Sequence, residues 1–401
     1  MNRRQFLYGA CGALAGMALP ACSVPPRPAA LPSRPTSAAG GTGGRKVIVV
    51  VFGGGTRYSE SIGDPAHVHI PMLWNELAPR GTLFTDVRIG GRIVHTNCTA
   101  SIVTGHREYD DDNDWSQPVD HPTLFEIFRK ARGGPDTAAW AFVYASILGN
   151  IGRSRAMGFG ARYAANLVEP PTIPRETAER IGSYLREESA SGSYEATLRA
   201  ATEAARWART ESHLNQGGLR SEPARRFIAE QYQAWKSGLG TTSHDAFLTD
   251  RAIACMRRFS PGVITVAFGE IDCAHYGSWS RYVEAIQRTD ELTWRLWQAA
   301  EGLEAYRGKT LMLILPDHGR ELERAGGLGY VHHSNFYTRE SEDEGCRRIW
   351  MLAVGEGIAR GRRVESTTPQ TAAAATALEY LGLKPSHGAE ASVLNSATGI
   401  A

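Results

Sequence analysis

Acidic and imidazole side chains directly follow two apolar runs of the sequence, and their types favour metal chemistry. Asp317 and His318 come after one run, and Asp272 and His275 come after another, with Glu270 as a competing carboxylate. Carboxylate oxygens and imidazole nitrogens are ligands that zinc and similar divalent ions take in proteins. Either pair could instead be a solvated turn with a capping histidine. If the two runs are neighbouring strands, however, both pairs would face one crevice.

Two further segments could complete a catalytic site. The glycine-containing segment around His332 and His333 suggests a loop that folds back to supply a ligand, and we favour His333. Residues 94–105 carry small hydroxyl side chains into a helix, whose positive N-terminal end would suit an oxyanion ligand or a nucleophile. Serine and threonine are also ordinary helix caps, so this segment has a purely structural interpretation as well.

The elements that would position these side chains alternate along the chain. Continuous apolar runs predict buried parallel strands, and stretches between them, such as 281–300, have helical periodicity. This alternation predicts a doubly wound, mostly parallel α/β sheet sandwiched by helices. Residues 172–260 are rich in Ala, Glu and Arg and predict a mainly helical insertion. The predicted strands are 46–52, 139–145, 262–268, 310–315 and 349–354.

The first 45 residues predict export and attachment rather than fold. Residues 1–22 combine a basic start with a short apolar run, and Arg3-Arg4-Gln5-Phe6-Leu7 resembles a twin-arginine export signal. The sequence before Cys22 resembles a lipobox and predicts its lipidation, although Pro20 is unusual there and leaves ordinary cleavage open. Residues 23–45 predict a flexible Pro/Ala/Ser/Gly tether. We therefore expect a periplasmic or cell-envelope protein that meets the membrane only through a lipid anchor.

Composition and charge exclude one class of partner. The chain is 42% hydrophobic and 21% charged, as in ordinary globular proteins. Residues 1–22 hold two of the 44 basic residues and no acid, so basic and acidic residues balance at 42 each in the remainder. A balanced chain lacks the basic footprint of nucleic-acid binding.

Four cysteines outside residues 1–22 fit no zinc spacing and predict either one or two disulfides or buried free thiols.

Taken in order, the motifs resemble those of the alkaline phosphatase/sulfatase superfamily over about residues 46–385, with 386–401 as a tail. The Asp-His-Gly after a strand is its most recognisable mark. Residues 70–86 resemble its element before the nucleophile, and residues 367–382 resemble its C-terminal helix. The resemblance implies an alkaline-phosphatase-like fold and a metal-dependent hydrolase of phosphate monoesters or diesters.

The resemblance also implies a two-metal site with zinc as the expected ion. Asp317 and His318 would bind one ion, and Asp272, His275 and His333 (or its neighbour) would bind the other. Paired ions would hold the oxygens of an in-line displacement at phosphorus or sulfur. The expected partner is therefore a small-molecule phosphate or sulfate ester.

Three departures from the family pattern leave the site partly open, and one is that Asp272 and His275 lie three residues apart here, against four in the family. The family's Asp after the first strand is replaced by Gly53-Gly54-Gly55, and the nearest acid is Glu60. A flexible glycine loop could bring Glu60 to the ion, or it could cradle a phosphate without a metal role. The nucleophile position, ten residues before Gly105, is His95, one step from Thr96. We expect Thr96 as the nucleophile, with His95 as the alternative catalytic residue or a metal ligand beside attacking water.

These departures keep two other functions open. The formylglycine motif Cys-x-Pro-x-Arg of sulfatases is absent around Cys98, yet a sulfatase or phosphonate hydrolase would need the same charge neutralisation. The other alternative is a binding protein without catalysis that kept the fold and lost the first metal Asp, because fold alone does not imply function.

Overall fold

The computed structural model describes residues 44–110, 115–170, 220–237, 243–322, 329–333 and 343–399, without the side chains of 232–237. The predicted signal, most of the tether and Cys22 lie outside these residues, as does much of the predicted insertion. The parts of the insertion that are described are mainly helical, as expected. Among the described helices, none has the length and apolar character needed to cross a membrane.

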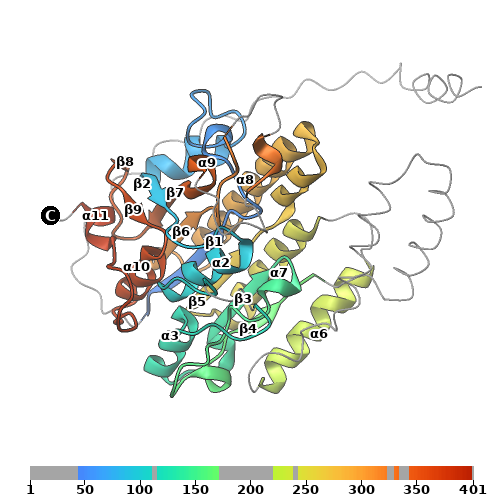
Figure 1. Ribbon diagram of the computed structural model, residues 1–401. Coiled ribbons are helices and arrows are strands. Elements are labelled where there is room, and N and C mark those ends of the chain that lie inside the picture. The colour runs from blue at the N-terminus through green and yellow to red at the C-terminus, as the bar shows by residue number, and fades with distance from the viewer. Residues whose placement is uncertain are drawn as a thin grey trace, which may run out of the picture. The chain divides into compact units, whose positions relative to one another are not determined.

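One sheet organises the described residues, in the order β4-β3-β5-β1-β6-β7-β2-β8, with β9 paired to β2 (Figure 1). From β4 to β6 all neighbouring strands are parallel, whereas β7 runs antiparallel to both β6 and β2. The doubly wound, mostly parallel α/β prediction is therefore confirmed. The strands are β1 (Lys46–Val51), β2 (Gly81–Arg88), β3 (Ala139–Val143), β4 (Asn166–Val168), β5 (Val263–Ala267), β6 (Thr310–Leu315), β7 (Arg348–Gly355), β8 (Arg362–Val364) and β9 (Thr368–Pro369).

Helices cover both faces of the sheet because its central strands are apolar on both sides. In β1, Val47 and Val49 pack into one buried cluster with α2, α3 and α10, while Ile48 and Val50 pack into another with α6, α7 and α8 (Figure 1). Burying each such side chain contributes about 1.5–3 kcal/mol relative to exposure. The helices are α2 (His95–Thr104), α3 (Leu124–Arg132), α6 (Glu222–Ser237), α7 (His244–Phe259), α8 (Trp279–Gly302), α9 (Glu344–Arg347), α10 (Ala372–Tyr380) and α11 (Leu394–Thr398).

All five predicted strands are present, but the structure adds elements that the apolar runs did not reveal. Strand β2 contains Thr85 and Asp86, so it does not form a continuous apolar run. The expected C-terminal tail contains α11, whose Ala397 is buried in the core. The hydroxyl of Thr82 donates to the Ala397 carbonyl at 2.8 Å, which ties α11 to the sheet.

The four cysteines within the described residues are all free thiols. Cys98, Cys255 and Cys346 are buried, and Cys273 is half-buried. Of the two alternatives that the sequence left open, the structure therefore has the free thiols.

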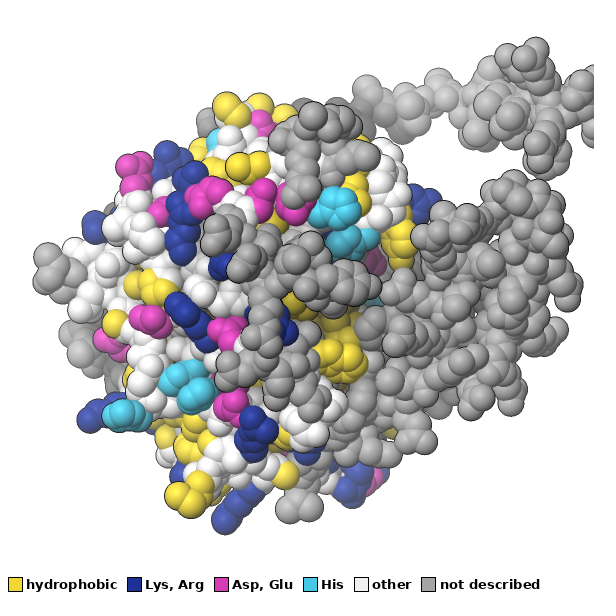
Figure 2. All heavy atoms as spheres, in the orientation of Figure 1, with side chains coloured by type: hydrophobic (Ala, Val, Ile, Leu, Met, Phe, Trp, Pro, Cys, Tyr) yellow, Lys and Arg dark blue, Asp and Glu magenta, His cyan; other side chains and the backbone are white. Residues whose placement is uncertain are grey.

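On the face shown in Figure 2, acidic and basic side chains are interspersed, in keeping with the balanced composition.

The end of β1 leaves no space for a side chain, which can be tested directly. A Cβ at Gly53 would lie 2.1 Å from the Phe268 carbonyl oxygen, a backbone atom that cannot move aside cheaply. We expect Gly53→Ala to lower the free energy of unfolding by about 3 kcal/mol, measured by denaturant titration. Gly134→Ala is the matched control, because its Cβ would make only an ordinary 3.5 Å contact with Ala138. Equal stability of the two variants would contradict this packing.

Candidate metal centre

The carboxyl edge of three adjacent strands brings the predicted ligands together. Asp272 and His275 lie in the 3-10 helix η9 (Glu270–Tyr276) after β5, and Asp317 and His318 follow β6. Strand β1 lies between β5 and β6, so the two segments leave the sheet as neighbours. His333 follows a second short helix, η10 (Gly329–Val331), and is buried like Asp317 and His318. The two motifs therefore come together at this edge, where His95 contacts both Asp272 and Asp317.

One carboxylate oxygen lies at the centre of a group of imidazoles. Oδ1 of Asp272 is 3.1 Å from Nε2 of His275, 3.2 Å from Nε2 of His95 and 4.0 Å from Nε2 of His333. One ligand atom from each of Asp272, His275 and His333 lies within 4.8 Å of the other two. The family resemblance implied these same three residues as the ligands of one of two expected ions.

His95 stands between both carboxylates of the cluster. It is the first residue of α2, at the edge of the sheet, and its ring is buried. Nδ1 of His95 lies 2.6 Å from Oδ2 of Asp317 and 3.0 Å from Nε2 of His318, while Nε2 faces Asp272. His95, His318 and His333 form a second group whose ligand atoms lie within 4.8 Å of one another. His95 thus contacts residues of both predicted ligand sets, Asp272 in one and Asp317 and His318 in the other.

The electrostatics of the cluster favour a cation between the carboxylates. Burial alone would lower the pKa of His95, but the charges of Asp272 and Asp317 raise it to about 10. Burial would raise the pKa of Asp317, yet His318 and His95 hold it at about 2. Burial lowers the pKa of His318 to about 4 and that of His333 further below its usual range. The charges of the protein alone therefore favour ionised carboxylates at Asp272 and Asp317 and a protonated ring at His95.

The hydrogen bonding of two buried ring nitrogens indicates that this cluster could hold a metal ion. Nδ1 of His333 has no hydrogen-bond partner among the described residues, and Nε2 of His95 has only its 3.2 Å ion-pair contact with Asp272. Leaving a buried polar atom unpaired costs about 1–3 kcal/mol, so such atoms are unusual without a ligand. The cluster offers imidazole nitrogens and a carboxylate oxygen, which are the donors that zinc prefers. The residues present therefore fit a divalent ion.

Two other predicted site residues have partners outside the cluster. The Thr96 hydroxyl is buried and donates to Oδ1 of Asn97 at 3.2 Å. The Glu60 carboxylate receives two hydrogen bonds from Arg57, at 2.6 and 2.8 Å, and one from the Tyr282 hydroxyl at 3.2 Å. Neither residue belongs to a group of possible metal ligands among the described residues. The glycine loop after β1 does bend, but it does not bring Glu60 to the cluster.

Sequence reasoning missed two residues at this site. Nη2 of Arg320 lies 2.7 Å from Oδ1 of Asp272, and Arg320 directly follows the Asp-His-Gly motif. Tyr144 directly follows β3, and its ring centroid lies 6.0 Å from that of His95, in an edge arrangement. The Tyr144 hydroxyl is buried without a hydrogen-bond partner among the described residues. Their place at strand ends was the available signal, since the same rule identified the histidines and aspartates.

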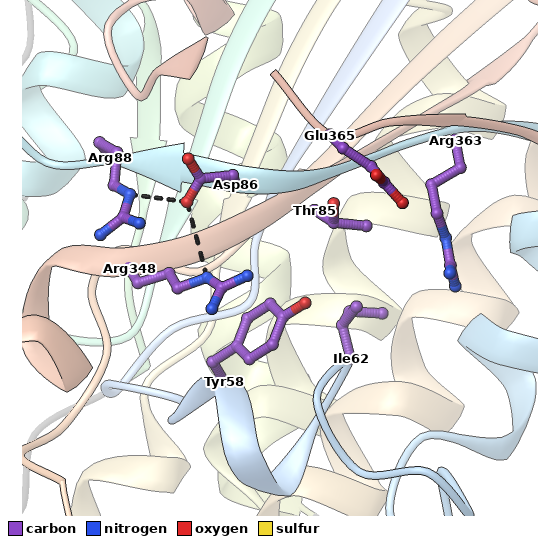
Figure 3. Close-up of a pocket in the computed structure, with 8 residues that line it drawn as sticks. All are labelled: Tyr58, Ile62, Thr85, Asp86, Arg88, Arg348, Arg363 and Glu365. Atoms are coloured by element: carbon purple, nitrogen blue, oxygen red, sulfur yellow. Dashed lines mark ion pairs between the residues drawn. The ribbon is translucent and has the colours of Figure 1, made fainter. Parts of the chain in front are cut away.

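A cavity of about 440 Å³ lies at the carboxyl end of β2, on the same edge of the sheet (Figure 3). Inside it, Oδ1 of Asp86 is 2.6 Å from Nε of Arg88 and 3.6 Å from Nε of Arg348. The cavity therefore holds paired charges, and no residue of the histidine cluster lines it. Its lining residues are Tyr58, Ile62, Thr85, Asp86, Arg88, Arg348, Arg363 and Glu365.

Comparison with known proteins identifies the fold. No protein-family model and no curated protein sequence matches this chain. A phosphonate monoester hydrolase from Silicibacter pomeroyi superposes with a TM-score of 0.54 and 14% identity over 89% of this chain and 77% of that chain. A 2-O GAG sulfatase gives 0.53 and 12% over 88% and 74%, and the Agrobacterium radiobacter phosphonate monoester hydrolase gives 0.51 and 16% over 88% and 77%.

The chain has the alkaline-phosphatase/sulfatase-like fold. The similarity extends over most of this chain. The fold that the motif resemblance predicted is therefore confirmed. At identities of 16% or less, the roles of individual residues are not carried by the comparison and depend on the geometry described above.

The raised pKa of His95 predicts proton release when this alkaline-phosphatase-like protein takes up a metal. Because Asp272 and Asp317 raise its pKa to about 10, the ring carries a second proton at neutral pH, which it must lose before Nε2 can bind a cation. Apparent zinc affinity should therefore rise with pH across the neutral range, by roughly tenfold per unit for one released proton. Calorimetry at pH 8 in two buffers of different ionisation enthalpy should show about one proton released per zinc. Zinc uptake without proton release would contradict this assignment.

Proposed function

We propose that the protein is a metal-dependent hydrolase of phosphate or sulfate esters. The observation that carries this proposal is the convergence of His95, Asp272, His275 and His333 on one point at the carboxyl edge of the sheet. Ligands of open α/β sheets bind at this edge, and the buried charges there are arranged to hold a cation. The similar structures named above include two phosphonate monoester hydrolases and a sulfatase, which supports ester chemistry for this fold.

Within that class we propose a phosphate monoester or diester as the substrate and zinc as the ion. The sulfatase motif is absent around Cys98, and this thiol is buried, with burial raising its pKa well above the usual value. A cysteine in that state is a poor precursor for reactive chemistry. A divalent ion at the cluster would neutralise charge on the ester oxygens in the transition state.

The side chains at the helix start favour attack by water over a covalent enzyme intermediate. His95 occupies the position where the resemblance places a nucleophile, and both of its ring nitrogens face the carboxylates of the cluster. The neighbouring Thr96 hydroxyl donates to Asn97 instead. We therefore assign His95 to the alternative that the sequence left open, as a ligand beside an attacking water, in place of Thr96 as a nucleophile.

Tyr144 is the candidate hydrogen-bond donor to a substrate oxygen, because its buried hydroxyl has no partner among the described residues. Burial raises the pKa of its hydroxyl well above the usual value, and nearby Asp272 and Asp317 act in the same direction. The hydroxyl therefore keeps its proton at neutral pH, which makes it a poor general acid but leaves it able to donate a hydrogen bond to an oxygen that gains charge in the transition state. We expect Tyr144→Phe to lower kcat by about 10²-fold on esters with good and with poor leaving groups, measured by steady-state kinetics, because a hydrogen-bond donor to the transition state is lost.

The cell-envelope location and lipid anchor stay proposals that rest on the sequence alone. The twin-arginine-like start delivers folded proteins, which agrees with a metal-binding chain, and Cys22 is the proposed attachment point. A small ester outside the cytoplasm is the substrate that fits this location.

A second candidate function is binding of an oxyanion or metal without turnover. One observation favours it, since the first-strand Asp of the family pattern is replaced by Gly53-Gly54-Gly55. The two functions differ in a single measurable property, which is turnover by the metal-loaded protein.

The experiment is a panel of four esters with the zinc-loaded protein: p-nitrophenyl phosphate, bis(p-nitrophenyl) phosphate, a phenylphosphonate monoester and p-nitrophenyl sulfate. We expect turnover of at least one phosphate ester, and loss of kcat/KM by about 10³-fold or more in His275→Ala, because a metal ligand is removed. His387→Ala, an exposed histidine outside the cluster, should behave as wild type. Bound zinc without turnover of any of the four esters would establish the binding alternative.

A further inference from the structure

The guanidinium of Arg320 lies fully buried at the end of β1, next to the cluster. Nε donates to the Gly55 carbonyl at 2.8 Å, and Nη2 donates to the Gly54 carbonyl at 2.6 Å and to Asp272 Oδ1 at 2.7 Å. Nη1 donates to the carbonyls of Tyr330 and Val331, both at 3.3 Å. An arginine has five N–H donors, so every donor of this side chain is used. Its positive charge is therefore fixed in place.

The backbone that binds this guanidinium also closes the position of the missing carboxylate. A Cβ at Gly53 would lie 2.1 Å from a backbone oxygen, and one at Gly54 would lie 2.5 Å from the amide nitrogen of Asp272. A Cβ at Gly55 would lie 2.7 Å from the ring of His318. Gly54 and Gly55 also have φ values of +97° and +77°, which disfavour any other residue. The end of β1 thus has no room for a metal-binding side chain.

Asp317 is already occupied by protein groups. Its Oδ1 accepts from the Gly55 amide at 3.1 Å, and its Oδ2 lies 2.6 Å from Nδ1 of His95. His318 uses Nδ1 to contact the Gly319 carbonyl at 2.8 Å. A carboxylate on the far nitrogen of an imidazole is the arrangement that orients a histidine ligand and strengthens its binding to a metal. Asp317 therefore fits the role of holding His95 rather than that of binding a second ion.

We propose that the centre takes one divalent ion, bound by Asp272, His275, His333 and Nε2 of His95, and that Arg320 supplies the second positive charge. Asp272 is then shared between the ion and the guanidinium, which neutralise one half-buried carboxylate from two sides. This inference deepens the proposed metal site and rests on it, but it does not require ester turnover. It replaces the two ions that the family resemblance implies with one ion and one fixed cation.

The ion count tests the inference without any substrate. The full chain is stripped with a chelator, reloaded with excess zinc and desalted, and zinc per chain is measured by mass spectrometry. We expect one zinc per chain in the wild type and none in His275→Ala. Two ions per chain in the wild type would overturn the inference, and so would none. A count of one without ester turnover would overturn the hydrolase proposal and leave this inference standing.

A substitution at Asp317 separates the two arrangements further. In Asp317→Asn we expect the count to stay at one while zinc affinity falls by about 10–100-fold, the usual cost of losing a carboxylate behind a histidine ligand. A centre with two ions would instead lose one of them. An unchanged affinity would show that Asp317 does not act through His95.

The charge of Arg320 is tested by a pair of variants and a probe anion. Arg320→Lys keeps the charge and Arg320→Met removes it, while both lose the five-donor arrangement. We expect the zinc-loaded Met variant to bind inorganic phosphate at least tenfold more weakly than the Lys variant, measured by calorimetry. Equal phosphate affinities would overturn the fixed-charge role. If the Met variant does not fold, the ion counts of the wild type and Asp317→Asn still decide the number of ions.

Discussion

The structure of this site depends on two carboxylates that are both held ionised, Asp317 fully buried and Asp272 half-buried. Burying an ionised group is costly unless opposite charges and hydrogen bonds surround it, and Asp272 and Asp317 are surrounded by imidazoles and one guanidinium. The arrangement of His95, His275 and Arg320 follows from this requirement. A divalent cation at the cluster would meet the same requirement, and its groups could hold one.

The fold meets this requirement through the order of its strands. Strands β5, β1 and β6 are adjacent and parallel, so the segments that follow them meet at one edge although they are far apart in the sequence. The absence of side chains at the end of β1 lets the backbone carbonyls of Gly54 and Gly55 accept hydrogen bonds from Arg320. The loop after β1 thus lacks the expected carboxylate and instead binds the guanidinium of Arg320 through its backbone carbonyls.

The sequence revealed those parts of the fold and site that have a local pattern. The apolar run of β1 and the Asp-His pair after β6 identify a buried strand and a candidate ligand from a few neighbouring residues. Strand β2 was not recognised as a strand because its polar residues interrupt the pattern. The partners of Arg320 and Glu60 depend on contacts across the sheet, and no local pattern shows where a backbone carbonyl will point. His95 was recognised as an alternative only because the resemblance fixed its spacing from Gly105.

The most direct test of this account is the coordination of zinc in the loaded full chain, measured by X-ray absorption at the zinc edge. The account predicts a low-coordinate nitrogen and oxygen shell with outer-shell scattering from three imidazoles, those of His95, His275 and His333. Outer-shell scattering from at most one imidazole, or a sulfur ligand, would show that the metal binds elsewhere and would contradict the central claim.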